Sequence, residues 1–146
     1  MKIVPDSNII LALAIPLPYT SVSLAKMQEW QQENTELIVP SLWSYEIVSS
    51  LRKGMAIGRI SSEQAIAALE SILAMGITEI PPTLRLHQLA LEWSVRLKQT
   101  VAYDAAYLAL AESQQAHFWT ADRRLVDAAN NCGASWVHHI GELQTG

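Results

Sequence analysis

Hydrophobic and polar residues follow two different rhythms along the chain. Short apolar runs bounded by proline, glycine or polar residues predict β-strands, at residues 2–4, 37–39, 77–80 and 117–120, with a candidate fifth strand at 135–139. Longer segments with apolar residues three and four positions apart predict helices, at residues 20–34, 41–58, 61–76, 83–99, 103–112 and 122–131. Short strands that alternate with helices are typical of an α/β fold with a mainly parallel sheet.

Length and composition favour one compact unit. Half of the 146 residues are hydrophobic, and no stretch rich in Gly, Ser or Pro forms a linker, so we expect a single domain over residues 1–146. The apolar run 9–15 is broken by Pro16 and is far shorter than a membrane-spanning helix, so we expect it inside the fold, with no membrane partner. The single cysteine, Cys132, excludes an internal disulfide. These features favour a cytoplasmic protein.

Aspartates are few and unevenly placed. Only four of the 14 acidic residues are aspartates: Asp6, Asp104, Asp122 and Asp127. Asp6 follows the first predicted strand and Asp122 follows the fourth, so both should face the rim where the carboxyl ends of parallel strands meet. Helix capping is an alternative explanation for any one aspartate alone. Asp127 we interpret as a surface partner of Arg123 and Arg124.

Glu46 is harder to explain as surface, because it lies in mid-helix beside Tyr45 and Ile47. A buried carboxylate without a partner must take up a proton, which raises its pKa. If Glu46 converges with the aspartates, their repulsion favours a divalent cation, and Mg²⁺ and Mn²⁺ prefer oxygen ligands. We therefore predict one or two such ions. Three neutral polar residues beside these acids are suited to orienting a ligand: Ser7, Asn8 and Thr120.

The net charge of −4 is unusual for a protein that binds nucleic acid. The four acids Asp6, Glu46, Asp104 and Asp122 carry as much negative charge as the chain has in excess, and two divalent ions would offset it. Five basic residues are candidates for phosphate contacts, although solvated surface is the commoner role of such residues: Arg52, Lys53, Arg59, Arg123 and Arg124.

Four motifs, in this order, resemble the PIN-domain family, and more narrowly the VapC-type toxins of bacterial type II toxin–antitoxin pairs. They are Asp-Ser-Asn after the first strand, a glutamate in the helix that Ser41 opens, Tyr-Asp-Ala-Ala-Tyr-Leu-Ala-Leu-Ala-Glu from Tyr103, and Thr-Ala-Asp-Arg-Arg-Leu from Thr120. The resemblance implies a three-layer α/β/α fold, with a short, mainly parallel central sheet and about six or seven helices.

The same resemblance implies a function and a set of site residues. Members of this family are metal-dependent endoribonucleases, usually homodimers, that a cognate antitoxin inhibits. The catalytic and metal-binding residues implied here are Asp6, Glu46, Asp104 and Asp122. Two alternatives stay open. One is an aspartyl-phosphate-type phosphatase with Asp6 as nucleophile, although Asn8 stands where a second acid is expected; the other is a non-catalytic PIN-like interaction module.

The histidines carry no ligand pattern in the sequence. His87 and His117 lack acidic or cysteine neighbours at metal-ligand spacing. His138 and His139 could ligate a metal, but we interpret a histidine pair beside an exposed tail as unremarkable. The tryptophans Trp43, Trp93 and Trp119 are expected in the core or in a dimer interface.

Overall fold

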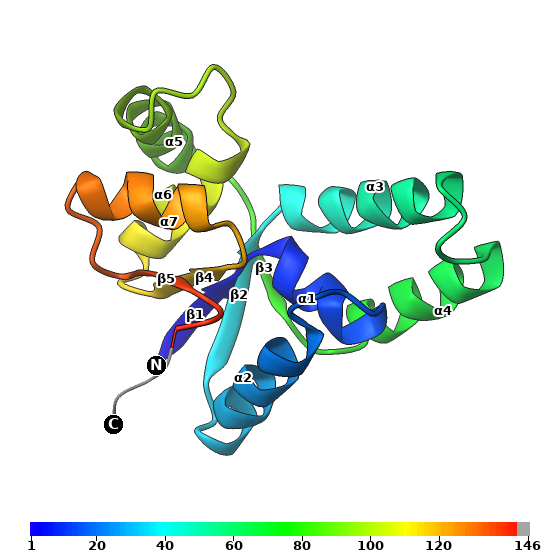
Figure 1. Cartoon of the computed structure of the whole chain (residues 1–146). Coiled ribbons are helices and arrows are strands. Elements are labelled where there is room, and N and C mark those ends of the chain that lie inside the picture. Colours follow the sequence, from blue (N-terminus) through cyan, green and yellow to red (C-terminus); the bar gives the residue numbers. More distant parts are fainter. Residues whose placement is uncertain (143–146) are drawn as a thin grey trace.

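A sheet of five short parallel strands lies at the centre of the computed structural model, which describes residues 1–142 (Figure 1). The strands are β1 (Lys2–Pro5), β2 (Glu36–Pro40), β3 (Thr78–Ile80), β4 (His117–Thr120) and β5 (Val137–His139). Their order across the sheet is β3-β2-β1-β4-β5, and every neighbouring pair is parallel. The first strand is therefore central, and the residue that follows it, Asp6, leaves the sheet between β2 and β4.

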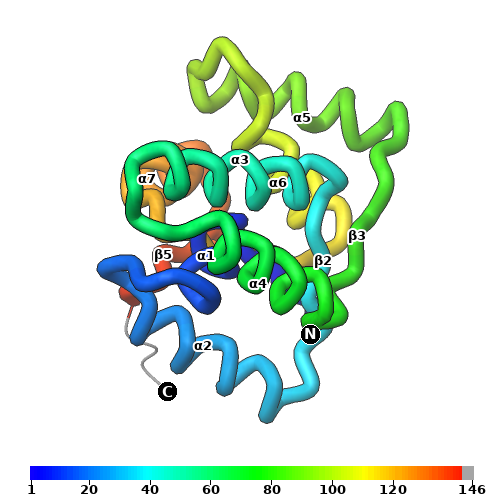
Figure 2. The backbone as a smooth tube through the Cα atoms, turned by 90° about the vertical axis from the view of Figure 1, so that its right-hand side faces the viewer, coloured from blue at the N-terminus to red at the C-terminus, as the bar shows by residue number. Residues whose placement is uncertain are grey.

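Seven helices surround the sheet within the described residues. They are α1 (Ser7–Ala14), α2 (Thr20–Gln32), α3 (Leu42–Ala56), α4 (Ser62–Leu73), α5 (Leu84–Arg96), α6 (Tyr103–Ser113) and α7 (Arg123–Asn131). In Figure 1, α5, α6 and α7 lie above the sheet and α2 below it, while α3 and α4 form a hairpin that projects to one side. Figure 2 shows that hairpin from its own side, with α1 behind it. The predicted three-layer α/β/α fold is confirmed.

Neighbouring residues of β4 show how the two helical layers join the sheet. Successive strand residues point to opposite faces. Phe118 packs against Tyr107 of α6, with ring centres 5.5 Å apart, while Trp119 packs edge-on against Trp30 of α2 at 6.1 Å. All four side chains are buried. Trp43 and Trp93 are buried as well, which agrees with the expected place of the tryptophans in the core.

Most elements lie where the sequence pattern predicts them, with ends shifted by a few residues. The exception is α1, which covers the apolar run assigned to no particular element; Ile9 and Ile10 in it are fully buried. Ser61 begins α4 with a reciprocal capping box in which its partner is Gln64. No helix within residues 1–142 is long and apolar enough to cross a bilayer.

Candidate active site

Four acidic side chains from four separate parts of the chain meet at the carboxyl edge of the sheet. Asp6 follows β1, Glu46 lies in α3, Asp104 in the first turn of α6, and Asp122 follows β4. Asp6 is repelled by Glu46 and by Asp104, Glu46 is repelled by Asp104, and Asp104 by Asp122. The structure thus brings together all four acids predicted from the sequence; we call this group the acid site.

Asp6 is the most deeply placed member of the acid site, with 8% of its surface exposed. Thr120 Oγ1 donates a 2.7 Å hydrogen bond to Asp6 Oδ2, and Ser7 Oγ donates a longer one, 3.4 Å, to Oδ1. Burial raises the pKa of Asp6 to about 7, against the hydrogen bond from Thr120, and repulsion by Glu46 and Asp104 adds to the increase. The carboxylate form is therefore costly here unless a cation comes close.

Thr120 connects both ends of the acid site. It is fully buried, and besides donating to Asp6 it accepts a 3.1 Å hydrogen bond from the backbone N–H of Asp122. Asn8 Nδ2 lies 3.4 Å from the same Oγ1, and Asn8 Oδ1 accepts from the backbone N–H of Ala121 at 3.4 Å. The polar residues expected to support the acids are thus in place, and they tie α1 to the end of β4.

Glu46 is held by a residue that the sequence did not single out. The Tyr107 hydroxyl donates to Glu46 Oε1. Burial raises the pKa of Glu46; the bond from Tyr107 opposes this change and the charge of Asp104 adds to it. The pKa of Tyr107 is raised well above its usual value by burial and by the carboxylates of Asp6 and Glu46, so its hydroxyl remains a donor. Tyr107 follows Asp104 by three positions, the spacing of one helix face.

Asp104 is held by a side chain from outside its own helix. Gln99 Nε2 donates a 3.0 Å hydrogen bond to Asp104 Oδ2. Burial raises the pKa of Asp104, partly offset by that bond, and repulsion by Asp122 raises it further. Gln99 has no partner for its own buried Oε1 within the described part of the chain. No sequence pattern marks Gln99, which lies in the turn before α6.

Helix capping accounts for only one member of the acid site. Asp122 caps α7, since its Oδ1 accepts from the backbone N–H groups of Arg124 at 3.0 Å and Leu125 at 3.2 Å. Asp6 is the N-cap residue of α1 but makes no capping hydrogen bond with its side chain. Asp104 lies inside the first turn of α6, whose N-cap is Ala102. For these two aspartates the capping alternative is wrong.

The predicted phosphate contacts are all exposed, and Lys53 shares a hollow with Glu46 of the acid site. Lys53 lines a hollow of about 410 Å³ together with Ser7, Glu46, Tyr45 and Tyr103. Arg59 lines a neighbouring hollow that Lys53 also borders, and Arg52 precedes Lys53 on α3. Arg123 and Arg124 directly follow Asp122. The pairing predicted between these two arginines and Asp127 is wrong: within residues 1–142 no ion pair joins them.

The acid site carries negative charge that no protein cation balances. Among the described residues the ion pairs are Lys26–Glu29 and His138–Glu142, and neither involves the four acids. In the same part of the chain no three His, Cys, Asp or Glu side chains are spaced to ligate one ion directly. Mg²⁺ commonly keeps several waters and uses only one or two carboxylates, so a hydrated divalent cation fits this donor set.

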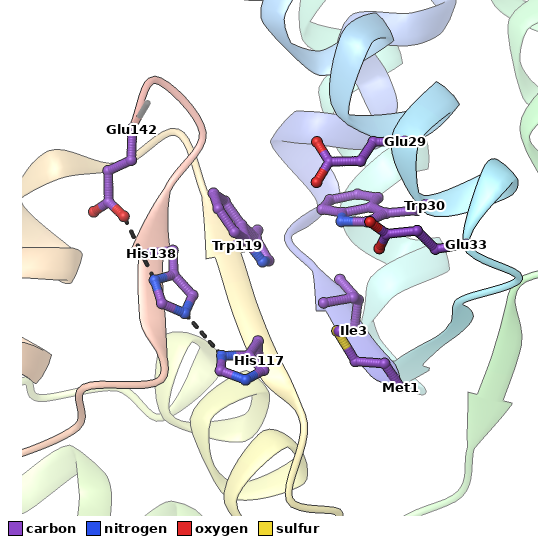
Figure 3. A pocket seen from close by; sticks show the side chains of 9 residues that line it. All are labelled: Met1, Ile3, Glu29, Trp30, Glu33, His117, Trp119, His138 and Glu142. Carbon is purple, nitrogen blue, oxygen red and sulfur yellow. Dashed lines mark hydrogen bonds and ion pairs between the residues drawn. The ribbon is translucent and has the colours of Figure 1, made fainter. Parts of the chain in front are cut away.

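Two histidines interpreted as unremarkable are in contact, and that interpretation does not describe them. His117 Nδ1 and His138 Nε2 are 2.8 Å apart, joined across β4 and β5. Burial lowers the pKa of His138, and the neighbouring His117 lowers it further. Both border a cavity on the sheet face that α2 covers, and none of the four acids lines that cavity (Figure 3). His139 has other partners, Ala121 O and the backbone N–H of Gly141.

Comparison with known proteins places this geometry in a family. The family model described as PIN domain matches residues 4–136, which includes the four residues of the acid site, the second half of β1 and all of β2, β3 and β4. The chain belongs to the PIN-domain family. The predicted resemblance is therefore confirmed.

Relatives of this PIN domain include named ribonucleases. A VapC ribonuclease of Mycobacterium bovis is 34% identical over 91 residues, covering 62% of this chain and 68% of the relative, and ribonuclease VapC9 of Mycobacterium tuberculosis matches equally well. Among solved structures, a protein of Pyrobaculum aerophilum has a TM-score of 0.69 at 23% identity, over 96% of this chain and 84% of that one. VapBC2 of Rickettsia felis, bound to a promoter DNA fragment, gives 0.70 at 12% identity, over 95% and 98%. The two structures show the same fold.

Proposed function

We propose that this PIN domain is an endoribonuclease that depends on Mg²⁺ or Mn²⁺ and acts as the toxin of a toxin–antitoxin pair. The observation that carries the proposal is the acid site, in which four carboxylates converge without a protein cation. The ribonuclease names of the relatives support RNA as the substrate. The proposed catalytic residues are Asp6, Glu46, Asp104 and Asp122.

These four acids would hold one or two divalent cations. They differ in burial and in how firmly they are held, so they would contribute differently to metal binding. When bound, the cation supplies Lewis-acid polarisation of the scissile phosphate and acidifies water near it. Asp6 is buried and fixed by Thr120, so it has the least freedom to move. Asp122 is the most exposed of the acids and is fixed through its own helix cap. A cation held by these acids would offset the burial, and the repulsion by Glu46 and Asp104, that raise the pKa of Asp6.

The remaining residues keep the acids fixed for an in-line attack on phosphorus. Tyr107 holds Glu46 and Gln99 holds Asp104, so neither carboxylate has to be ordered when substrate binds. Lys53 and Lys98 border the hollows beside Glu46 and Asp104, but within the described residues no lysine or histidine forms an ion pair with the four acids. The carboxylates themselves are therefore the groups that accept the proton of the attacking water.

The surface around the acid site suits an RNA strand. Two hollows meet at Glu46 and Tyr103: the one of about 410 Å³ bordered by Lys53, and one of about 500 Å³ bordered by Lys98 and Asp104. Tyr45 and Tyr103 are 77% and 63% exposed, so their rings are open to stacking with bases. Lys53, with the neighbouring arginines Arg52, Arg59, Arg123 and Arg124, would contact phosphates.

A protein partner is part of the proposal. Several solved structures of similar fold are toxin–antitoxin complexes, among them one from Klebsiella pneumoniae and VapBC-1 of nontypeable Haemophilus influenzae. By analogy we propose a cognate antitoxin, and a homodimer as the assembly that binds it. A cytoplasmic location goes with this role.

The direct test compares RNA cleavage by the wild type and by Asp104→Asn in Mg²⁺ or Mn²⁺. The matched control is Asp127→Asn, because Asp127 is an exposed aspartate on α7 outside the acid site. We expect Asp104→Asn to lose about 100-fold or more of the activity, the control to keep it, and a chelator to abolish it.

Other outcomes would identify the alternatives. Equal activity of wild type and Asp104→Asn would exclude the proposed site. Hydrolysis of small phosphate esters with no RNA cleavage would favour the phosphatase reading. Antitoxin binding without any cleavage by the wild type would favour a non-catalytic module.

A further inference from the structure

A second polar cluster lies on the sheet face that α2 covers, at the starts of β1 and β4. A cavity of about 290 Å³ is bordered there by His117, His138, Glu142, Trp119, Glu29 and Glu33 (Figure 3). We call it the histidine pocket. It contains none of the four acids, and nothing in the proposed ribonuclease mechanism uses it.

The two imidazoles are fixed by strand register. His138 is the direct partner of Trp119 in the β4–β5 pairing, and His117, two residues before Trp119, points to the same face. His117 Nδ1 and His138 Nε2 are 2.8 Å apart, with ring centres 5.0 Å apart. Because both residues belong to neighbouring strands of the central sheet, their nitrogens are held together by rigid backbone rather than by a loop.

Glu142 decides which nitrogen of His138 is free. Its Oε2 lies 3.5 Å from His138 Nδ1, on the side opposite His117, and Figure 3 shows the three residues in a row. With the Nδ1–H group directed at Glu142, the Nε2 of His138 presents a lone pair to His117, which donates its own hydrogen from Nδ1. A carboxylate that orients the far side of a histidine in this way is a recurring support for metal-ligating histidines.

We propose that the histidine pocket binds a transition-metal cation of the Zn²⁺, Ni²⁺ or Cu²⁺ class between His117 Nδ1 and His138 Nε2. The ion takes the place of the shared hydrogen, which His117 then carries on Nε2. Zinc–nitrogen distances of about 2.0–2.1 Å around a tetrahedral ion put two imidazole nitrogens about 3.3 Å apart, so the pair has to open by only about half an ångström.

The rest of the pocket suits such an ion and its water. No third His, Cys, Asp or Glu in residues 1–142 stands at ligating distance, so water completes the coordination in the 290 Å³ cavity. Glu33 borders that cavity from α2 and offsets positive charge, whereas Glu29, on the same helix, is already paired with Lys26 at 3.3 Å. The buried Nε1–H of Trp119, 4% exposed as a residue, has no partner in the described residues, and a water of the coordination shell would accept from it. Imidazole nitrogen selects these metals, whereas the oxygen ligands of the acid site select Mg²⁺ or Mn²⁺.

The test is calorimetric titration of the full chain with Zn²⁺, and with Ni²⁺, in excess Mg²⁺ that saturates the acid site. We expect one strong site in the wild type and at least a tenfold loss of affinity in His117→Gln and in Glu142→Gln. His117 is exposed, so its substitution leaves the fold intact. The control is His87→Gln, since His87 is an exposed histidine of α5 outside this pocket.

A second readout reports the position of the ion. The rings of Trp119 and His138 are 4.7 Å apart, so Cu²⁺ bound at the pair should quench part of the tryptophan fluorescence, and Trp119→Phe should remove that part. RNA cleavage in Mg²⁺ should be the same for His117→Gln and the wild type. The proposal is wrong if the wild type takes up no Zn²⁺ in excess Mg²⁺, if His117→Gln binds it unchanged, or if His87→Gln loses it equally.

Discussion

The acid site and the histidine pocket both adjoin the strands β1 and β4, yet they follow opposite physical rules. At the acid site, backbone loops and helix starts bring like charges together, and burial raises the pKa of Asp6 to about 7. In the histidine pocket the two imidazoles share one hydrogen across a strand pair, without charge repulsion in the neutral form. Without a cation, the carboxylates of the acid site repel one another, whereas the two histidines still form their hydrogen bond.

This contrast indicates that the acid site was shaped by selection for function, whereas ordinary packing is enough to account for the histidine pair. The acid site lowers the stability of the metal-free protein, because its carboxylates repel one another and three of them are desolvated without a protein cation as partner. Such a cluster is expected only where its chemistry is used. A hydrogen-bonded histidine pair has no such cost, so its presence alone does not indicate metal binding. The calorimetric titration with Zn²⁺ tests that binding directly.

The largest expected effect is a loss of RNA cleavage on substitution of Asp6, a change that should affect the acid site and not the histidine pocket. Asp6→Asn should reduce RNA cleavage by about 100-fold or more, since it removes the charge of the most buried acid, and it should leave Zn²⁺ binding at the histidine pair unchanged. Cleavage assays and calorimetry on the same preparation measure both. If the substitution weakens Zn²⁺ binding as strongly as it weakens cleavage, the two sites are not independent.

The pH dependence of the free energy of unfolding should arise mainly from Asp6 in the acid site. The folded-state pKa of Asp6 is about 7, above its ordinary 3.8, so the folded protein holds this proton more tightly than the unfolded chain. Stability of the metal-free protein should then fall as pH rises from about 4 to about 7, by an amount on the order of 3 kcal/mol, and level off above.

Urea denaturation in a chelator at pH 5 and pH 8 measures this fall. Asp6→Asn should remove most of it and should make the protein more stable than the wild type at pH 8. Adding Mg²⁺ should stabilise the wild type more at pH 8 than at pH 5, because the ion binds the deprotonated form. A wild type that is equally stable at both pH values would contradict the pKa assigned to Asp6.

A smaller effect is expected from substituting Thr120, which hydrogen-bonds both Asp6 and the backbone of Asp122. Thr120→Val keeps the shape of the side chain but removes the donor of the buried hydrogen bond to Asp6 and the acceptor of the partly buried one from the Asp122 N–H. We expect a loss of about 1–3 kcal/mol in the free energy of unfolding and a fall in activity of about tenfold. Thr120→Ser, which retains the hydroxyl, should recover most of the activity; if it does not, the methyl group matters more than the hydrogen bonds.

The sequence predicts the strands and most helices because their apolar periodicity is regular. The β4 run His117–Thr120 matches its prediction residue for residue, and β1 extends its predicted run by Pro5 alone. Asp6 and Asp122 were placed at one rim because both directly follow a strand. Glu46 stood out because a carboxylate is unusual beside apolar helix residues. All these signals are local or follow from the general rule for parallel sheets.

What the sequence could not predict depends on contacts between distant segments. Gln99 and Tyr107 hold two of the acids, but neither differs in type or spacing from ordinary helix and turn residues. His117 and His138 are 21 positions apart and meet only because β4 and β5 pair in one particular register. In strands this short, the sequence alone does not determine the register, because it depends on how the helices pack on both faces of the sheet.

The order of the strands also bears on when the protein becomes active during its own synthesis. Asp6 is made first, but its backbone N–H donates to the carbonyl of Trp119, and its carboxylate is held by Thr120, at the far end of the chain. A growing chain that has not yet produced β4 lacks this strand of the sheet, Thr120 and Asp122. On the proposed function, a growing chain still attached to its ribosome has no assembled nuclease site until β4, Thr120 and Asp122 have been translated, long after Asp6 itself.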